Sequence, residues 1–154
     1  MRFILVDDII DLVPGARAHG VKTLEAEEDV FRDHFPGFPV VPGVLLTEMM
    51  AQLGGKCLDA EDEGRGKAML VQVRQASFRR WVRPGERVDI YAEVTSSSAV
   101  YGSALGRIEV GGAEAASADL IFSFVPRSQF SADFRDEVLE RYLRARSRRQ
   151  AGPA

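Results

Sequence analysis

The feature that most constrains the fold is the segment from Pro42 to Cys57, which carries apolar residues on every side of a helix. Proline suits the first position of a helix, so we expect a helix that begins at Pro42 and runs towards Cys57. A helix that is apolar all round is normally buried on all sides. The rest of the chain is therefore expected to wrap around this segment.

Six other segments have the apolar and β-branched composition of strands, and Pro-Gly, Gly-Gly and serine turns separate them. The first two are expected to form a hairpin and the last four an antiparallel meander. Such a sheet curled around a central buried helix is an α+β architecture of the hot-dog type. The expected strands are Arg2–Leu12, Arg17–Glu25, Ala68–Phe78, Arg87–Thr95, Tyr101–Val110 and Glu114–Val125.

Two segments fall outside this pattern. Residues 30–43 combine aromatic side chains with prolines and glycines, which predicts an ordered loop that packs and excludes a regular element. Ser131 is expected to cap a final helix with an apolar stripe and a basic end, of which the simplest interpretation is a solvated helix terminus. We divide the chain into a hot-dog domain, residues 1–127, and a C-terminal helical extension with a basic tail, residues 128–154. The stripe comprises Phe134, Val138, Leu139, Tyr142 and Leu143.

Composition narrows the class of protein. The 154 residues are 45% hydrophobic and 28% charged, which suits one globular domain with a real core. A formal charge of -3 favours neither a nucleic-acid partner nor a membrane surface. The single cysteine, Cys57, cannot form an internal disulfide and is expected to be a buried thiol. The acidic start lacks a signal peptide's basic leader, and no apolar run is long enough to span a membrane. We expect a cytoplasmic protein.

Glu48 is the most informative residue, because a carboxyl group within an apolar helix must be paired, neutralised or used in chemistry. Burial favours the protonated form of a carboxyl group, which would leave a proton to donate near neutral pH. Gln52 lies one helical turn further on the same face and is expected to orient the Glu48 carboxyl group by a hydrogen bond. The bland alternative is that Glu48 satisfies a neighbouring strand or a dimer contact.

Two further residues complete a candidate site. His34 lies in the packed loop and can exchange a proton near pH 7, so His34 and Glu48 form a plausible base and acid pair. Gly43, near the start of the helix, leaves backbone N–H groups free for a carbonyl oxygen that gains negative charge. A histidine that holds backbone carbonyls and a glycine that allows close packing are the alternatives. His19 is expected to be a surface residue, and neither a metal nor a cofactor is predicted.

Taken together, residues 33–55 resemble the active-site segment of the 3-hydroxyacyl-acyl-carrier-protein dehydratases. The family pattern is His-Phe-Pro-Gly, then Pro and Pro-Gly, then a helix in which Ala-Gln follows the acid. A looser resemblance at residues 78–80 and 82–86 extends the similarity through most of the chain, to about Phe124. The matching positions are His34-Phe35-Pro36-Gly37, Pro39, Pro42-Gly43, Glu48 and Ala51-Gln52.

The resemblance implies a homodimer in which His34 of one chain faces Glu48 of the other, with a larger assembly such as a trimer of dimers as an option. It implies that His34 removes the C2 proton, that the Gly43 N–H binds the thioester carbonyl, and that Glu48 protonates the departing 3-hydroxyl group. The substrate would be an acyl-carrier-protein or coenzyme A thioester, with its acyl chain in a tunnel between the protomers. Glutamate at position 48 resembles the branch of the family that only dehydrates.

Several departures from the family pattern affect substrate shape more than the reaction. Asp33, Phe38 and Met49 replace the usual glycine, polar residue and alanine, and the family's N-terminal Leu-Pro-His-Arg-Tyr-Pro stretch is absent from the sequence. The helix after Ser131 has no counterpart in the minimal pattern and could cover the tunnel, reinforce an oligomer or dock a partner.

Carrier protein is acidic, so arginines near the expected tunnel mouth are candidates for its recognition: Arg79, Arg80 and Arg83. Ordinary solvated charges are the alternative interpretation. Two rival functions remain at the level of the sequence. An acyl thioesterase of the same fold could use the helix carboxylate for hydrolysis, and a catalytically silent subunit could bind acyl chains or partner an active homologue.

Overall fold

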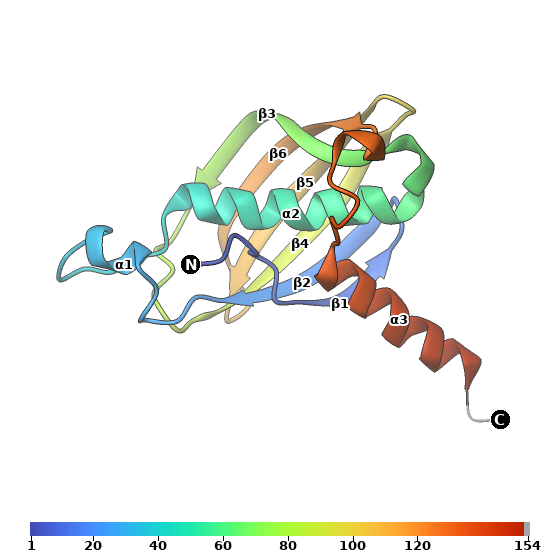
Figure 1. The fold of residues 1–154 in the computed structure, drawn as a ribbon. Helices are drawn as coiled ribbons and strands as arrows, with labels where there is room; N and C mark the ends of the chain where they lie inside the picture. The colour runs from blue at the N-terminus through green and yellow to red at the C-terminus, as the bar shows by residue number, and fades with distance from the viewer. Residues whose placement is uncertain (153–154) are drawn as a thin grey trace.

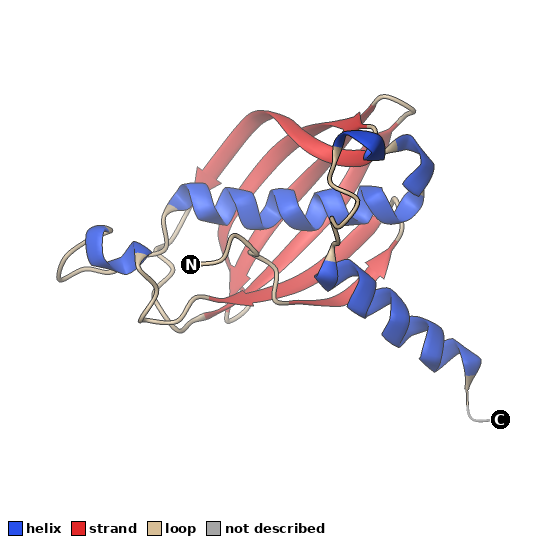
Figure 2. Ribbon diagram, in the orientation of Figure 1, coloured by secondary structure: helices blue, strands red, loops and turns tan. Residues whose placement is uncertain are grey.

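The computed structural model describes residues 1–152 and shows a six-stranded antiparallel sheet curved around one long helix (Figures 1 and 2). The helix, α2, spans Gly43–Glu61 and lies across one face of the sheet. The α+β hot-dog architecture expected from the sequence is confirmed. The strands are β1 (Asp8–Val13), β2 (Arg17–Thr23), β3 (Lys67–Phe78), β4 (Arg87–Ser97), β5 (Tyr101–Val110) and β6 (Ala113–Val125).

The strand order is β1-β2-β4-β5-β6-β3, so the predicted four-strand meander is wrong at its first member. β4, β5 and β6 are sequential neighbours, but β3 pairs with β6 and forms the far edge of the sheet. The physical reason is α2, which separates the β1–β2 hairpin from β3 in the sequence. The C-terminal end of α2 lies beside the β1–β2 turn, where the Gly15 N–H donates to the Cys57 carbonyl oxygen at 3.0 Å, and the chain then passes to the other edge of the sheet, where β3 begins (Figure 1).

The N-terminal strand is shorter than predicted, because β1 begins only at Asp8. The preceding residues run past α2, where the Leu5 N–H donates to Gln52 Oε1 at 2.9 Å. Asp7 accepts from the Thr23 N–H at 2.9 Å and from Lys22 Nζ at 2.8 Å. Side chains therefore satisfy backbone groups that a sheet partner would otherwise bind.

The prediction that residues 30–43 contain no regular element is wrong at the start of this segment, because Val30–Asp33, which precede its prolines and glycines, form one helical turn, α1. The long helix begins at Gly43 with Pro42 as its N-cap residue, one position later than predicted, and continues to Glu61. A short 3-10 turn, η1 (Glu63–Arg65), then leads into β3.

The prediction that α2 is buried on every side is wrong for the single chain. Its sheet-facing residues are fully buried, but Val44 is 75% exposed and Glu48 and Gln52 are only half-buried. Two glycines of β5 allow the helix to approach the sheet: a Cβ at Gly106 would lie 2.6 Å from Met50 Cβ, and one at Gly102 would lie 2.8 Å from Leu58 Cδ1. The fully buried core residues of α2 are Met49, Met50, Leu53, Cys57 and Leu58.

The final helix, α3, spans Glu137–Ala151 and follows a 3-10 turn, η2 (Arg127–Gln129). Asp136 caps it by accepting from the Leu139 N–H at 3.0 Å, so the predicted cap at Ser131 is wrong. The reason is that residues 131–134 form a turn of their own, in which the Phe134 N–H donates to the Ser131 carbonyl oxygen. Phe134 therefore lies outside the helix.

α3 covers the outer edge of β1. The Leu12 N–H donates to Tyr142 Oη at 3.1 Å, and Arg146 donates to the Leu12 carbonyl oxygen at 3.1 Å. Arg141 donates to the Asp7 carbonyl oxygen at 2.6 Å. These side chains occupy backbone groups that would otherwise pair with another strand. Among the described residues, no helix is long and apolar enough to cross a membrane.

Replacement of Gly106 by alanine should destabilise the fold, because the new Cβ would overlap Met50. Overpacking of this kind costs about 1–3 kcal/mol, measured as a lower urea midpoint with an unchanged slope. The matched control is Gly55→Ala on α2, where a Cβ would meet nothing closer than 3.7 Å. That change should stabilise the helix by up to about 1 kcal/mol. Equal effects of both changes would contradict close packing at Gly106.

Candidate active site

His34 follows α1 and is held by the backbone of its own loop. Its Nδ1 lies 3.2 Å from the Val40 carbonyl oxygen, and its ring stacks on Phe35 with centroids 4.1 Å apart. Since a carbonyl oxygen only accepts, Nδ1 is the protonated nitrogen of the neutral ring, and Nε2 is the nitrogen that can accept a proton. The alternative explanation of His34, that it serves only to hold a backbone carbonyl, accounts for Nδ1 but not for Nε2.

Glu48 lies in the second turn of α2 and is oriented by Gln52, as predicted. Gln52 Nε2 donates to Glu48 Oε1 at 3.1 Å and is 3.2 Å from the Phe3 carbonyl oxygen. Gln52 Oε1 accepts from the Leu5 N–H. Three hydrogen bonds thus fix the amide and, through it, the carboxyl group. The carboxyl group is half-buried, so in the single chain it is less enclosed than the sequence suggested.

A cleft of about 560 Å³ opens beside Glu48. It runs along the open face of α2, where Glu48, Gln52 and Lys56 succeed one another at intervals of one helical turn. Residues 2–4 and the first part of β3 form its sides, and residues 134–138 contribute from the C-terminal part of the chain. Glu48 therefore faces a space that can hold an elongated ligand.

Gly43 is the first residue of α2, so its N–H is one of those that have no partner within the helix. The Phe78 ring packs over it. A Cβ at this position would lie 3.1 Å from Cε1 and Cζ of that ring and 3.2 Å from Cδ1. The contact supports the close-packing explanation of this glycine. It also leaves the N–H at the end of the helix where the dipole favours negative charge.

The three candidate arginines are placed differently. Arg83 lies over the Phe38 ring at 4.9 Å, so it flanks the loop that carries His34. Arg80 pairs with Glu86 at 3.2 Å and also donates to a backbone carbonyl. Arg79 pairs with Glu114 of β6 at 2.6 Å. The structure thus brings only Arg83 into contact with the active-site loop.

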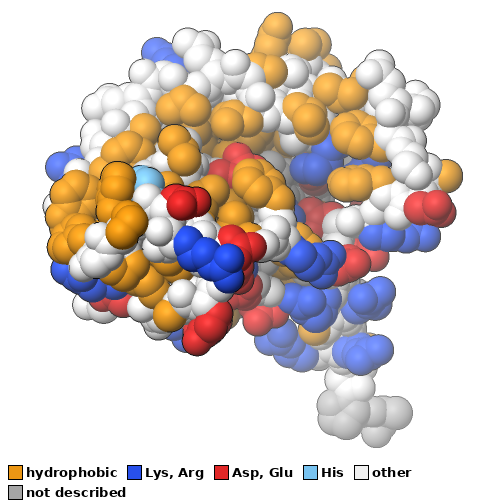
Figure 3. All heavy atoms as spheres, turned by 60° about the vertical axis from the view of Figure 1, so that its left-hand side comes forward, with side chains coloured by type: hydrophobic (Ala, Val, Ile, Leu, Met, Phe, Trp, Pro, Cys, Tyr) orange, Lys and Arg blue, Asp and Glu red, His pale blue; other side chains and the backbone are white. Residues whose placement is uncertain are grey.

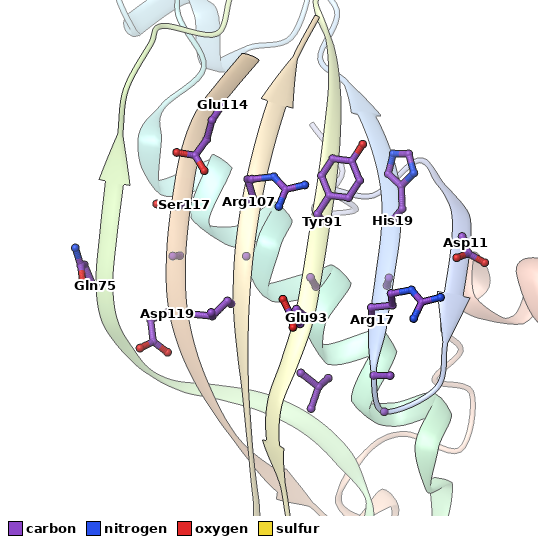
Figure 4. A pocket seen from close by; sticks show the side chains of 18 residues that line it. Asp11, Arg17, His19, Gln75, Tyr91, Glu93, Arg107, Glu114, Ser117 and Asp119 are labelled. Atoms are coloured by element: carbon purple, nitrogen blue, oxygen red, sulfur yellow. The ribbon is translucent and has the colours of Figure 1, made fainter. Parts of the chain in front are cut away.

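A second hollow, of about 1010 Å³, lies on the face of the sheet that is turned away from α2 (Figure 4). None of the predicted site residues lines it. His19 does line it, stacks on Tyr91 and bonds to Asp89 at 2.8 Å. Arg107 also lies over the Tyr91 ring and pairs with Glu109. Mutually paired charges of this kind are typical of a solvated sheet face, which agrees with the surface role predicted for His19.

Lys56 and its partner Asp136 were not predicted from the sequence. Lys56 is buried in α2, and its Nζ lies 2.8 Å from Asp136 Oδ2, with side chains 11% and 13% exposed. A lysine within an otherwise apolar helix is a signal of the same kind as Glu48, two turns earlier. Its partner, however, is 80 residues away in the sequence, so only the tertiary structure identifies it.

Cys57 is fully buried, and its thiol is near the Val13 carbonyl oxygen. Burial raises the pKa of the thiol from 9.0 to about 11. Because the thiolate is the nucleophilic form, the folded protein should resist alkylation by iodoacetamide at pH 8 and react only after unfolding. The neutral thiol stabilises the fold below pH 9, and this contribution should be lost as the pH rises towards 11. Rapid labelling of the native protein would contradict this placement.

Comparison of the sequence with known proteins identifies the family of this chain. A FabA-like domain matches residues 1–119. The 3-hydroxyacyl-[acyl-carrier-protein] dehydratase FabZ of Pelotomaculum thermopropionicum is 41% identical over 122 residues, which cover 79% of this chain and 87% of that protein. FabZ of Syntrophotalea carbinolica is 40% identical over 129 residues, covering 82% and 88%. The chain therefore belongs to the FabA-like family of 3-hydroxyacyl-[acyl-carrier-protein] dehydratases.

Solved structures agree with this fold. A chain of the dehydratase heterocomplex ApeI:P from Xenorhabdus doucetiae has a TM-score of 0.66 at 19% identity and covers 82% of this chain and 86% of its own length. The zebrafish thioesterase superfamily member 2 has a TM-score of 0.62 at 13% identity, covering 76% and 80%. At these identities the likeness shows the hot-dog fold alone, since both dehydratases and thioesterases adopt it.

Proposed function

We propose that His34 and Glu48 are the base and the acid with which this protein, a 3-hydroxyacyl-[acyl-carrier-protein] dehydratase of fatty-acid or related acyl-chain biosynthesis, converts 3-hydroxyacyl thioesters to trans-2-enoyl thioesters. The observation that carries the proposal is the pair of prepared groups: a histidine with Nε2 free and a carboxyl group held by Gln52 beside an elongated cleft. Because the chain belongs to a family of dehydratases, dehydration is the reaction that we assign to these two groups. A cytoplasmic location suits such an enzyme.

In the proposed mechanism, His34 Nε2 takes a proton from C2 while the thioester carbonyl accepts a hydrogen bond from the Gly43 N–H. The electron pair of the C2–H bond forms the C2=C3 double bond, and the C3–O bond breaks. Glu48, in its protonated form, gives its proton to the departing hydroxyl group, which leaves as water. Proton return from His34 to Glu48 through solvent closes the cycle. We propose that no double-bond isomerisation follows.

The proposed site is shared between two copies of the chain, with His34 of one facing Glu48 of the other. Within residues 1–152, β3 pairs only with β6, so its other edge is free along a 12-residue strand. An exposed apolar edge of this length favours pairing with a second copy. Hydrophobic side chains also gather over the end of the molecule that carries α1 (Figure 3). The exposed apolar residues of β3 are Met69, Leu70, Val71, Val73 and Phe78.

Carrier protein is the proposed donor of the acyl chain, as the names of the FabZ relatives state for those enzymes. Arg83 is the preferred contact, because it flanks the active-site loop and its guanidinium lies over Phe38 without an ion-pair partner among the residues described. Arg79 and Arg80 already face Glu114 and Glu86, so they would have to exchange partners to bind an acidic surface.

His34→Ala and Glu48→Gln should each lower the rate of dehydration by about 10²–10⁴-fold, the usual contribution of a positioned acid or base. The assay is hydration of a medium-chain enoyl thioester, followed by loss of absorbance and gain in mass, with free thiol monitored in the same tube. Glu48→Gln keeps an oxygen for the hydrogen bond from Gln52, so the fold should be retained.

The matched control is His19→Ala, which removes the other of the two histidines from the opposite face of the sheet. It should leave the rate within a few-fold of the unaltered protein. Release of thiol would identify a thioesterase instead, and absence of both reactions on coenzyme A and carrier-protein substrates would favour a silent acyl-binding subunit.

Mixed dimers test the shared site directly. Co-expression of His34→Ala and Glu48→Gln chains with different tags allows the heterodimer to be purified. One of its two sites would then contain both intact residues, so about half of the full activity should return although each homodimer is inactive. A heterodimer as inactive as its parents would show that both residues act within one chain.

A further inference from the structure

The cleft beside Glu48 extends beyond the part of the chain that resembles its family. Its lining follows α2 from Glu48 through Gln52 and Gly55 to Lys56, where residues 134–138 join it. Those residues lie after β6 and outside the FabA-like match, which ends at residue 119. The C-terminal segment from η2 to α3 thus contributes to the same cleft as the proposed acid.

Two buried ion pairs lie at the end of the cleft that is distant from Glu48. Lys56 Nζ is 2.9 and 2.8 Å from the two carboxyl oxygens of Asp136, which also caps α3. Lys67 lines the same end, and its Nζ is 2.6 Å from Asp59 Oδ2. Separation of such a pair would leave a charge without a partner in a poorly solvated place, which is strongly unfavourable. An alkyl chain therefore meets a fixed ionic boundary here.

Apolar side chains make up about half of the lining of the cleft, which also includes the charged residues Arg2, Arg135 and Glu137. Gly55 leaves room on the α2 side, since a Cβ there would have no neighbour closer than 3.7 Å. Phe134 precedes Asp136 by two residues, is 37% exposed and packs on Phe130 with ring centroids 5.4 Å apart. The apolar lining comprises Phe3, Ile4, Ala51, Met69, Leu70, Phe122, Phe134 and Val138.

We infer that residues 134–138 close the far end of the acyl-binding cleft and restrict the enzyme to short and medium acyl chains, with Phe134 as the wall that sets the limit. The inference rests on the proposed function, because it takes an acyl thioester as the occupant. From Glu48 to Lys56, eight residues of helix rise about 12 Å. Glu48 acts at C3 and the Phe134 ring takes up part of this span, so an acyl chain of about ten carbons in all should fit. Of the three roles considered for the C-terminal extension, we therefore infer that it covers the tunnel.

The test is a comparison of kcat/KM for hydration of enoyl thioesters from four to sixteen carbons. The unaltered protein should gain up to about tenfold for every two methylene groups that the cleft buries, and then lose activity beyond about ten carbons. Phe134→Ala should move the optimum to longer chains by two or more carbons. Gly55→Val, which fills the cleft from the other side, should move it to shorter chains.

Asp133→Ala is the matched control, because it removes the side chain next to Phe134 in the same segment, and Asp133 is exposed and does not line the cleft. It should leave the chain-length profile unchanged, whereas general loosening of the segment would alter both variants alike. Melting curves identify any variant that fails to fold. If Gly55→Val or the control fails, the chain-length profile of Phe134→Ala decides the test. Equal activity on eight and sixteen carbons, or an unchanged profile in Phe134→Ala, would overturn the inference.

Failure of the proposed function would look different, because no chain length would then be hydrated by any form of the protein. In that case the same variants are compared by calorimetric binding of saturated acyl-pantetheine thioethers, which cannot react. Affinity that rises to about ten carbons, and further only in Phe134→Ala, would still support closure of the cleft by residues 134–138. Affinity without any dependence on length would refute it.

Discussion

Close contact between α2 and the sheet is the constraint on which the rest of the structure depends. The helix approaches β5 at Gly102 and Gly106, where a side chain of any other residue would collide with Leu58 or Met50. This contact fixes the rotation of the helix as well as its position. Since Met50 and Leu58 must face the sheet, Glu48 is turned to the open side. The position of the proposed acid is thus a consequence of core packing.

Gln52 converts that position into a defined orientation. Its amide joins three parts of the chain, because it contacts Glu48 on its own helix and backbone groups of Phe3 and Leu5 in the N-terminal segment. The same contacts explain why residues 2–7 do not extend β1. A side-chain amide that satisfies backbone groups can replace a strand partner. The departure from regular structure therefore serves the site.

The two edges of the sheet differ in a way that bears on assembly. Side chains of α3 occupy the backbone groups of Leu12 and Asp7 at the β1 edge, so that edge is closed to another strand. The β3 edge has no strand partner within residues 1–152 and carries exposed apolar residues. The C-terminal extension thus combines two effects, because it blocks one edge of the sheet and also reaches the cleft beside Glu48 through the Lys56–Asp136 pair.

The sequence by itself determined the fold class and the positions of α2 and of most strands within a few residues, and it predicted the candidate pair His34 and Glu48. These follow from local signals: hydrophobic periodicity, turn residues, and a carboxyl group within an apolar helix. Even the Glu48–Gln52 hydrogen bond was predictable, since residues four apart are neighbours on a helix.

Tertiary structure alone decided the rest. The pairing of β3 with β6, the Lys56–Asp136 contact and the coverage of β1 by α3 each join segments that are far apart in the sequence. The cap of α3 at Asp136 and not Ser131 belongs to the same group, because Lys56 holds that carboxylate. Local propensity leaves such choices open. Long-range packing and charge pairing determine the outcome, because these contacts form, and stabilise one local conformation over another, only when the chain folds.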